Sequence, residues 1–382
     1  MLRVLSRCAI TFPALSGKLT SLNHTFQEIF RRHTPDMKIG MLTGGGDCPG
    51  LNPAIRGAVL RLLDYGDDVI GFTQGWKGLV EGHTEPLTLA RVEGIIDQGG
   101  TILRSSRTNP FAPGKEDQLQ AVLANIKTFE LDALIALGGE DTLGVASKLY
   151  TQHGVKTVGV PKTMDNDLDK TDYTFGFDSA ASVALEAMDR LRDTARSHDR
   201  VMVVEIMGRH AGWTALWAGV GGGADWVLIP EVEADIEGMC KHLQAMYARG
   251  KTYGLVAVSE GVEIPGAQKS EDAQLDAFGH HQLGDVGIGP AIAKEIEKRT
   301  GIPTRDVVLG HTVRGGAPTL FDRILGTRVG IKAAELVHAG DFGKMVAQQG
   351  TEIVAVPIED AVKQWKLVPR ALYDEFTTTF NK

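Results

Sequence analysis

Short apolar runs alternate along the chain with longer segments in which apolar residues recur at helical spacing. Runs without polar interruption are typical of strands buried on both faces of a parallel sheet, and the segments between them predict helices. This alternation predicts an α/β fold with mostly parallel sheets. The expected strands cover residues 38–43, 68–72, 131–137, 155–160, 200–206, 226–230, 254–261, 305–312 and 352–358. The clearest helices are expected at 52–65, 116–130, 142–150 and 178–197.

The segment LDALIALGGEDT, residues 131–142, joins an expected strand to an expected helix through two glycines. A turn of this kind can direct backbone N–H groups and a helix N-terminus at a phosphate. Glu140 and Asp141 would repel that ligand unless one carboxylate holds Mg²⁺ and the other restricts which ligand fits. The alternative is an ordinary turn whose two acidic side chains are solvated.

Two further strand ends carry segments that suit a ligand site, GGGD at 44–47 and PKTMDND at 161–167. The first segment follows neither the GxGxxG pattern nor a Walker motif, because it lacks the lysine. In open parallel sheets, ligands bind beyond the carboxyl ends of the strands, so both segments and 138–142 are expected to line one crevice. Three acidic side chains follow the second of these strands: Asp165, Asp167 and Asp169.

A long loop is expected at residues 97–115, where Arg104 and Arg107 stand among glycine, serine and proline. Two arginines in such a loop indicate a mobile basic flap. The alternative is a solvated loop without a ligand.

Other local features complete the expected outline of the fold. Residues 75–82 are expected to form a loop, and residues 262–285 a polar surface insertion. Asp178 or Ser179 is expected to cap the N-terminus of the long helix, since both side chains can accept a backbone hydrogen bond there.

Composition narrows the class of protein. The 382 residues are 43% hydrophobic and 23% charged, as in globular domains, and the net charge of −8 argues against non-specific nucleic-acid binding. Three cysteines show neither a disulfide nor a metal-binding pattern, which favours a reducing compartment and a cytoplasmic location. No apolar run is as long as a membrane span, so no membrane partner is expected.

The first 36 residues differ from the rest of the chain, since basic and hydroxyl residues dominate and no acidic residue precedes Glu28. This composition is typical of a transit peptide, or it marks an extension ahead of a folded part that begins at Met37. We adopt the second interpretation and expect residues 1–36 to be disordered.

Six motifs, in order along the chain, resemble those of the phosphofructokinase family. The resemblance runs from about Lys38 to about residue 360, and each motif stands at a strand end. The motifs are GGGDCPGLNPAIRG (44–57), GGEDT (138–142), PKTMDND (161–167), MGRHAGW (207–213), SEG (259–261) and GHTVRGGAPTLFDR (310–323).

This resemblance implies transfer of a phosphoryl group to the 1-hydroxyl of fructose 6-phosphate, with Mg²⁺ as cofactor. It makes Asp165 the general base, Glu140 the metal ligand and Gly46 a close backbone approach to the donor phosphate. Arg107 is expected to bind the donor, and Arg209 to act in catalysis. The residues implied to bind the sugar phosphate are Thr163, Met164, Asp165, Met207, Gly208, Arg209, Glu260, His311 and Arg314, with Asp167 beside them, and Arg200 and Arg305 from a neighbouring subunit. A homodimer or homotetramer with shared sites follows.

The donor is predicted from two departures from the ATP-dependent members of the family, which tend to have glycine where this chain has Asp141 and Lys162. Asp141 adds bulk and negative charge where the α-phosphate of ATP would lie, while Lys162 can neutralise the departing phosphate of a shorter donor. Both changes together resemble the pyrophosphate-dependent phosphofructokinases, and a reversible reaction is expected. Three alternatives remain: an ATP-dependent enzyme, a catalytically silent sugar-phosphate-binding subunit, and a lipid or NAD kinase sharing only the glycine turn.

The implied fold has two similar Rossmann-like, three-layer α/β domains with the active site in the cleft between them. The larger domain, expected to bind the donor and Mg²⁺, comprises residues 37–176 and 313–362. The smaller domain, expected to bind fructose 6-phosphate, comprises residues 177–312 and 363–382.

Overall fold

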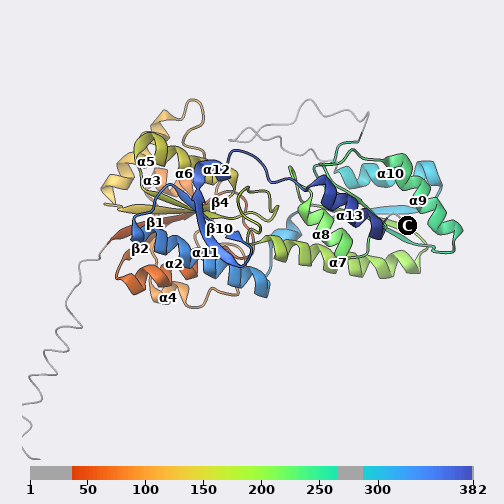
Figure 1. Cartoon of the computed structure of the whole chain (residues 1–382), viewed down its shortest axis with the longest axis horizontal. Helices are drawn as coiled ribbons and strands as arrows, with labels where there is room; N and C mark the ends of the chain where they lie inside the picture. The colour runs from red at the N-terminus through yellow and green to blue at the C-terminus, as the bar shows by residue number, and fades with distance from the viewer. Residues whose placement is uncertain (1–36, 265–286, 381–382) are drawn as a thin grey trace, which may run out of the picture.

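The computed structural model describes residues 37–264 and 287–380, which form two lobes side by side (Figure 1). The predictions for residues 1–36 and for most of the insertion at 262–285 lie outside these residues. No helix in the described part of the chain has both the length and the apolar character needed to cross a membrane.

The larger lobe is built on a seven-stranded sheet in the order β11-β10-β5-β4-β1-β2-β3. The five inner strands pair in parallel, while β3 and β11 pair antiparallel at the two edges. Strands β4 and β5 are buried along their whole length, as their uninterrupted apolar sequences predict. The strands are β1 (Lys38–Thr43), β2 (Asp68–Phe72), β3 (Thr84–Pro86), β4 (Ala133–Gly138), β5 (Thr157–Pro161), β10 (Lys344–Gln349) and β11 (Glu352–Pro357).

Helices cover both faces of this sheet and give the lobe three layers (Figure 1). On one face lie α2 (Leu51–Tyr65), α4 (Leu89–Val92) and α11 (Leu320–Ala339). On the other face lie α3 (Trp76–Glu81), α5 (Glu116–Thr128), α6 (Glu140–His153) and α12 (Ile358–Ala361). The apolar cluster on the second face is confined to this lobe, whereas the cluster on the first face continues into the smaller lobe.

The smaller lobe is built on a four-stranded, fully parallel sheet in the order β7-β8-β6-β9. Its strands are β6 (Val201–Ile206), β7 (Trp226–Leu228), β8 (Gly254–Ser259) and β9 (Thr304–Val308). One face packs against α7 (Phe177–Ser197), α8 (Trp213–Gly221) and α13 (Arg370–Phe380), and the other against α9 (Ile236–Ala248) and α10 (Ile288–Thr300). A short 3₁₀ helix, η1 (Gly310–Arg314), follows β9.

The chain passes between the two lobes three times. It leaves the larger sheet after β5, forms the smaller sheet from β6 to β9, and returns through η1 and α11 to β10 and β11. The last helix, α13, packs against α8 of the smaller lobe. The predicted α/β class with mostly parallel sheets is confirmed.

Some local predictions were wrong for reasons that lie outside the local sequence. Residues 75–82, expected as a loop, contain α3, because Trp76 and Leu79 bury their side chains in the core. Strands β3 and β10 were not predicted, and the strand expected at 305–312 ends at Val308, where η1 soon follows. The loop at 97–115 contains no strand or helix, as expected.

The predicted N-cap of the long helix was also wrong. Helix α7 begins after Gly176, whose φ of 98° lies in the left-handed region that favours glycine. The hydroxyl of Ser179 instead donates to the Asp322 carboxylate at 2.6 Å, and Asp178 accepts from the Thr319 hydroxyl at 2.6 Å. Both side chains therefore join α7 to the beginning of α11.

Candidate functional site

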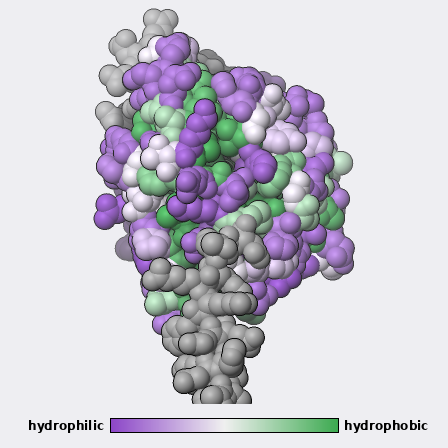
Figure 2. All heavy atoms as spheres, turned by 90° about the vertical axis from the view of Figure 1, so that its left-hand side faces the viewer, coloured by the Kyte–Doolittle hydropathy of each residue, from purple (hydrophilic) through white to green (hydrophobic). Residues whose placement is uncertain are grey.

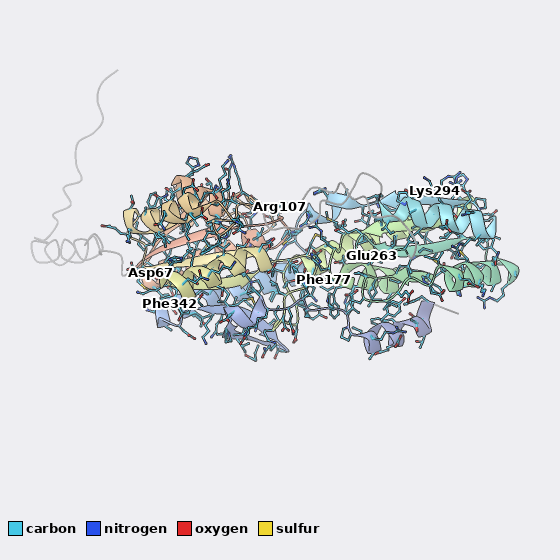
Figure 3. All side chains as sticks on the ribbon, turned by 90° about the horizontal axis from the view of Figure 1, so that it is seen from above. Asp67, Arg107, Phe177, Glu263, Lys294 and Phe342 are labelled. Carbon is cyan, nitrogen blue, oxygen red and sulfur yellow. The ribbon has the colours of Figure 1, made fainter. Side chains whose placement is uncertain are left out.

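The site begins at the carboxyl end of β1, in the triglycine loop that we define as residues 44–47. The Gly45 N–H donates to the Ser106 carbonyl at 3.1 Å, and the Ser105 hydroxyl donates back to the Gly45 carbonyl. The Thr43 hydroxyl donates to the Arg104 carbonyl at 2.7 Å. The long arginine-bearing loop is thus bonded to the triglycine loop, and Figure 3 places exposed Arg107 at the end of the larger lobe that faces the smaller one.

Lys162 joins the ends of three neighbouring strands. Its side chain is 4% exposed, and its ammonium donates to the Gly46 carbonyl after β1 at 2.6 Å. Its backbone N–H donates to the Gly138 carbonyl of β4 at 2.9 Å. Burial lowers the pKa of this lysine, and the nearby positive charge of Arg314 lowers it further. The Lys162 amino group is therefore buried against the triglycine loop, where burial disfavours its charged form.

Asp165 lies in the catalytic loop, our name for residues 162–175 after β5. Its Oδ1 atom is buried and accepts no hydrogen bond from the described residues, although its N–H donates to the Thr163 hydroxyl at 3.1 Å. Burial raises the pKa of this carboxyl, while the charges of Arg314, Lys162 and Arg209 oppose the rise. A buried carboxylate with a free oxygen among cations can accept a proton from a bound hydroxyl.

Two further carboxyl groups in this region have raised pKa values. Burial, together with the charge of Asp165, raises the pKa of Asp167 to about 7. A hydrogen bond from Thr163 partly offsets this rise. The same two causes raise the pKa of Glu260 to about 7. Glu260 follows β8 of the smaller lobe, and its electrostatic interaction with Asp165 indicates that the carboxyl ends of strands from the two sheets lie close together.

The turn after β6 is held by the end of β8. The Ser259 hydroxyl donates to the Gly208 carbonyl at 2.6 Å, and the Glu260 N–H donates to the Ile206 carbonyl at 2.9 Å. Gly208 has a φ of 149°, and a Cβ there would lie 2.7 Å from the Ala211 carbonyl oxygen, so the turn requires glycine. These bonds fix the backbone from Met207 to Arg209 beside Glu260.

The 3₁₀ helix η1 carries two of the predicted residues. Arg314 donates from Nη1 to the Asp47 carbonyl at 3.0 Å, so it connects η1 to the triglycine loop. A Cβ on Gly46 would lie 2.7 Å from the same Nη1 atom, which means that a side chain there would displace the guanidinium. His311, on the same helix, is exposed.

Arg200 and Arg305 are not brought together with the other predicted residues. They lie at or before the starts of β6 and β9, whereas Met207 and His311 follow the ends of these strands. Six residues of strand span about 20 Å, so the two arginines lie at the opposite end of the smaller sheet. Arg305 is exposed and pairs with Glu297 at 3.7 Å.

An open cleft of about 510 Å³ lies along α6, between this helix and the residues from Glu359 to Lys363. Glu140 and Asp141 line it from one side, and Lys363 from the other. Within the described ranges, no three His, Cys, Asp or Glu side chains are arranged to enclose a metal ion. That sparse set still fits Mg²⁺, which is usually bound by one or two carboxylates together with waters and substrate phosphates.

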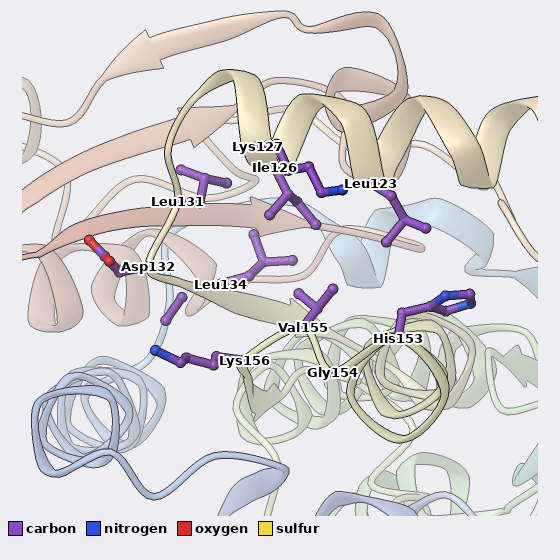
Figure 4. A pocket seen from close by; sticks show the side chains of 11 residues that line it. Leu123, Ile126, Lys127, Leu131, Asp132, Leu134, His153, Gly154, Val155 and Lys156 are labelled. Carbon is purple, nitrogen blue, oxygen red and sulfur yellow. The ribbon is translucent and has the colours of Figure 1, made fainter.

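A second cleft, of about 290 Å³, lies at the other end of the larger sheet, ahead of β4 and β5 (Figure 4). Its lining includes Leu123, Leu131 and Val155, with Lys127 and His153 beside them. Figure 2 views this outer end of the larger lobe, where apolar side chains show among hydrophilic ones. None of the predicted site residues lines this cleft.

Two residues that were not predicted from the sequence motifs belong to the site region. Thr142 is buried in α6, and a Cβ on Gly44 would lie 2.5 Å from its hydroxyl oxygen, so it supports the triglycine loop. Lys366 lies beside the catalytic loop but belongs to a segment near the C-terminus without any motif. Thr142 stands within a quoted motif, whereas the sequence around Lys366 gives no signal.

The fold and site define a two-lobed α/β protein whose glycine-rich loops and buried carboxyl groups meet at the carboxyl ends of two mostly parallel sheets. The chain belongs to the phosphofructokinase family, whose model, described as Phosphofructokinase, matches residues 38–337.

The family assignment agrees with individual relatives. The chain is 56% identical to a protein of Dictyoglomus thermophilum named pyrophosphate–fructose 6-phosphate 1-phosphotransferase, over 91% of this chain and 99% of that one. It is 48% identical to a protein of Streptomyces coelicolor named ATP-dependent 6-phosphofructokinase 2, over 90% of this chain and all of that one. A solved structure from Nitrosospira multiformis, titled a pyrophosphate-dependent phosphofructokinase, aligns with a TM-score of 0.77 over 91% of this chain and 92% of that one. At 18% identity, this last likeness shows the fold alone.

Proposed function

We propose that this protein transfers a phosphoryl group from pyrophosphate to the 1-hydroxyl of fructose 6-phosphate, giving fructose 1,6-bisphosphate and phosphate. The observation that carries the choice of donor is the pair Asp141 and Lys162. Asp141 lies in the first turn of α6, and Lys162 is bonded to the triglycine loop. The name of the 56% identical relative supports the same donor. The reaction is reversible, because the phosphate groups exchanged are of similar energy.

The donor argument is electrostatic. The α-phosphate of ATP would bring negative charge and a nucleoside toward the carboxylate of Asp141, whereas pyrophosphate ends before that point. Lys162 is buried beside Gly46, where its ammonium form would neutralise the phosphate that departs. Arg107 would contact the donor from the long loop.

The chemical step requires one proton acceptor and several cations. The 1-hydroxyl of the sugar gives its proton to Asp165 as its oxygen bonds to the transferred phosphorus, and the bridging bond of pyrophosphate breaks to release phosphate. Arg209 and Lys162 would stabilise the charge on the transferred group, since both influence the Asp165 carboxyl electrostatically. Glu140 would hold a divalent cation, which we propose to be Mg²⁺, and this ion would neutralise charge on the phosphates.

We assign fructose 6-phosphate to the strand ends of the smaller sheet. Thr163 and Met164 of the catalytic loop, with Asp167, would hold the end that carries the 1-hydroxyl. Met207, Gly208, Arg209, Glu260, His311 and Arg314 would contact the rest of the sugar phosphate.

The assembly and the domain division are also proposals. Arg200 and Arg305, at the far end of the smaller sheet, would serve the site of a neighbouring copy in a homodimer or homotetramer. The donor domain would comprise residues 37–176 and 313–362, and the sugar-phosphate domain 177–312 and 363–382. Free, buried Cys48 and Cys240 support a reducing, cytoplasmic location.

The test is phosphorylation of fructose 6-phosphate by purified protein with Mg²⁺, using pyrophosphate and ATP in parallel. Activity with pyrophosphate alone supports the proposal. Activity with ATP alone would overturn the donor and favour the second candidate, an ATP-dependent phosphofructokinase, which the 48% identical relative supports. Inactivity with both donors in an assembled oligomer would favour a silent sugar-phosphate-binding subunit.

Asp141→Gly tests the donor argument directly. The substitution removes the carboxylate from the first turn of α6, so kcat/KM with ATP is expected to rise by at least about tenfold, a change of about 1.4 kcal/mol in transition-state binding. Steady-state kinetics with both donors measure the change, and Asp117→Gly in the first turn of α5 is the control. Unchanged exclusion of ATP would refute the role of Asp141.

A further inference from the structure

The segment after α12, residues 362–369, runs beside the catalytic loop on its way to α13. The Lys366 N–H donates to the Asp167 carbonyl at 2.8 Å. Next to this bond, Leu168 and Trp365 form an antiparallel bridge. The segment is therefore bonded, through one hydrogen bond and one isolated bridge, to the part of the catalytic loop that follows Asp165.

The same segment is fastened to the smaller lobe. The indole N–H of Trp213, the first residue of α8, donates to the Lys366 carbonyl at 2.8 Å. The Trp365 ring stacks on His210 at 4.5 Å, in the turn after β6. The Val368 N–H donates to the Glu231 carboxylate at 2.9 Å. The backbone of Lys366 thus bridges the catalytic loop and α8.

The side chain of Lys366 bonds to the C-terminal part of the catalytic loop. Its ammonium donates to the carbonyl oxygens of Thr171 at 2.9 Å and Asp172 at 2.8 Å, and lies 5.4 Å from the centre of the Trp213 ring. The carboxylates of Asp167, Asp172 and Asp169 face it and favour its charged form. Burial lowers its pKa to about 8, so it remains mostly charged at neutral pH.

We propose that Lys366 is a positioning residue for the phosphoryl transfer: it holds the catalytic loop against α8 and favours the ionised form of the neighbouring carboxyl groups. It acts through Asp167, whose charge in turn interacts with the carboxyl of Asp165, and it needs no contact with either substrate. This inference rests on the proposed function, because it assumes that the base lies in this loop. A residue that bonds to both the catalytic loop and α8 would keep the base in register with a hydroxyl bound on the smaller lobe.

Lys366→Met tests the proposal, because it removes the ammonium and keeps most of the stem. We expect kcat to fall about tenfold or more, as displacements of about 1 Å do in active sites. We also expect the acid limb of the pH profile of kcat to move up by about one pH unit, since carboxylates without the cation bind protons at higher pH. Lys366→Arg should restore the position of the acid limb.

Lys251→Met is the matched control. Lys251 is also half-buried, pairs with the Asp225 carboxylate and lies 4.9 Å from the centre of the Tyr253 ring. It precedes β8, at the end of the smaller sheet away from the catalytic loop. This variant should lose stability and keep the wild-type pH profile.

A second variant keeps the test decisive if Lys366→Met does not fold. The buried hydroxyl of Thr214 on α8 donates to the Met164 carbonyl at 3.1 Å, so Thr214→Val removes another link between α8 and the catalytic loop. We expect a lower kcat without a shift of the acid limb.

Two results would overturn the proposal: wild-type kcat and pH profile in Lys366→Met, or a shift that Lys366→Arg does not reverse. If Lys366→Met does not fold, a wild-type kcat in Thr214→Val would overturn it. All profiles are measured with the donor that the wild-type protein uses, so an error in the donor assignment leaves this test intact.

Discussion

At the scale of single residues, burial is what distinguishes the carboxyl groups of the site from the many acidic residues on the surface. Asp165 has a buried oxygen that accepts no hydrogen bond within the described part of the chain, and three basic side chains lie close enough to influence it. Asp169, four residues further on, forms an ion pair with Lys170. Burial and neighbouring charges therefore give different electrostatic environments to two aspartates that the sequence alone does not distinguish.

Asp165→Asn removes the proposed base and leaves the shape of the site intact. We expect kcat to fall about 10²- to 10⁴-fold with either direction of reaction, as for loss of a general base. Thermal stability should be unchanged or higher, because burial disfavours the ionised carboxylate. Steady-state kinetics and thermal unfolding measure both effects, with exposed Asp374→Asn as the control. Near wild-type kcat in the variant would exclude Asp165 as the base.

Glu260 predicts how stability depends on pH. Its pKa rises from 4.5 to about 7 on folding, so the folded state binds more protons between these values and becomes less stable as pH increases. The wild-type protein should lose stability between pH 4 and pH 8, and Glu260→Gln should reduce this loss in the free energy of unfolding by on the order of 2–3 kcal/mol.

Urea unfolding at both pH values measures the loss of stability in each protein. Asp167 and Asp322, whose pKa values are also raised, act in the same direction and remain in the Glu260→Gln variant. The comparison between the two proteins therefore isolates Glu260. The exposed substitution Glu375→Gln should keep the full wild-type loss, and an equal loss in Glu260→Gln would contradict the prediction.

At the scale of elements, the donor side of the site depends on the crossing of α2 and α11. Helix α2 begins four residues after the triglycine loop, and α11 returns from the smaller lobe to pack against it. Glycines allow the approach, since a Cβ on Gly57 would lie 2.5 Å from the Thr327 carbonyl oxygen, and one on Gly330 2.2 Å from that of Ala54. A shift of this pair would move the loop that is proposed to hold the donor.

Gly330→Ala should destabilise the protein by about 1–3 kcal/mol, because the added methyl group cannot fit without separating the helices. A higher KM for pyrophosphate should accompany the loss. Gly221→Ala in α8 is the control, since a Cβ there meets no atom within 4 Å. Thermal unfolding midpoints compare the two variants, and an unchanged midpoint in Gly330→Ala would show that the crossing tolerates the methyl group.

At the scale of the whole molecule, the two lobes divide the proposed site between them, and the chain joins them at three crossings. Arg200 and Arg305 are remote from the residues that gather around Asp165. If they bind the 6-phosphate, as the family resemblance implies, a single copy lacks a complete site.

Subunit complementation tests this division. Arg200→Ala and Asp165→Asn should each be nearly inactive alone, and mixed oligomers should recover activity, because some sites then combine a native Asp165 with a native Arg200. Mixing Asp165→Asn with Lys162→Met should recover none, since both residues come from the same copy. Activity after dissociation and reassembly gives the readout, and failure of the first mixture would argue against shared sites.

The sequence by itself determined the features that depend on short stretches of chain. Uninterrupted apolar runs predicted most of the strands, and their order in βα units predicted parallel sheets whose carboxyl ends carry the motifs. Lys162, Asp165 and Glu260 were predicted from the motifs that resemble those of the phosphofructokinase family, and the structure brings Lys162 and Glu260 within electrostatic reach of Asp165. Their catalytic and binding roles remain predictions, as do the domain boundaries.

Only the tertiary structure decided the features that depend on contacts between distant residues. Asp178 and Ser179 bond to the beginning of α11 and leave the cap of α7 to Gly176. Lys366 contacts the catalytic loop from 194 residues further along the chain, and no sequence motif predicts this contact. Local patterns of polarity fix which segments become strands and helices, whereas burial and long-range hydrogen bonds exist only after those elements have packed.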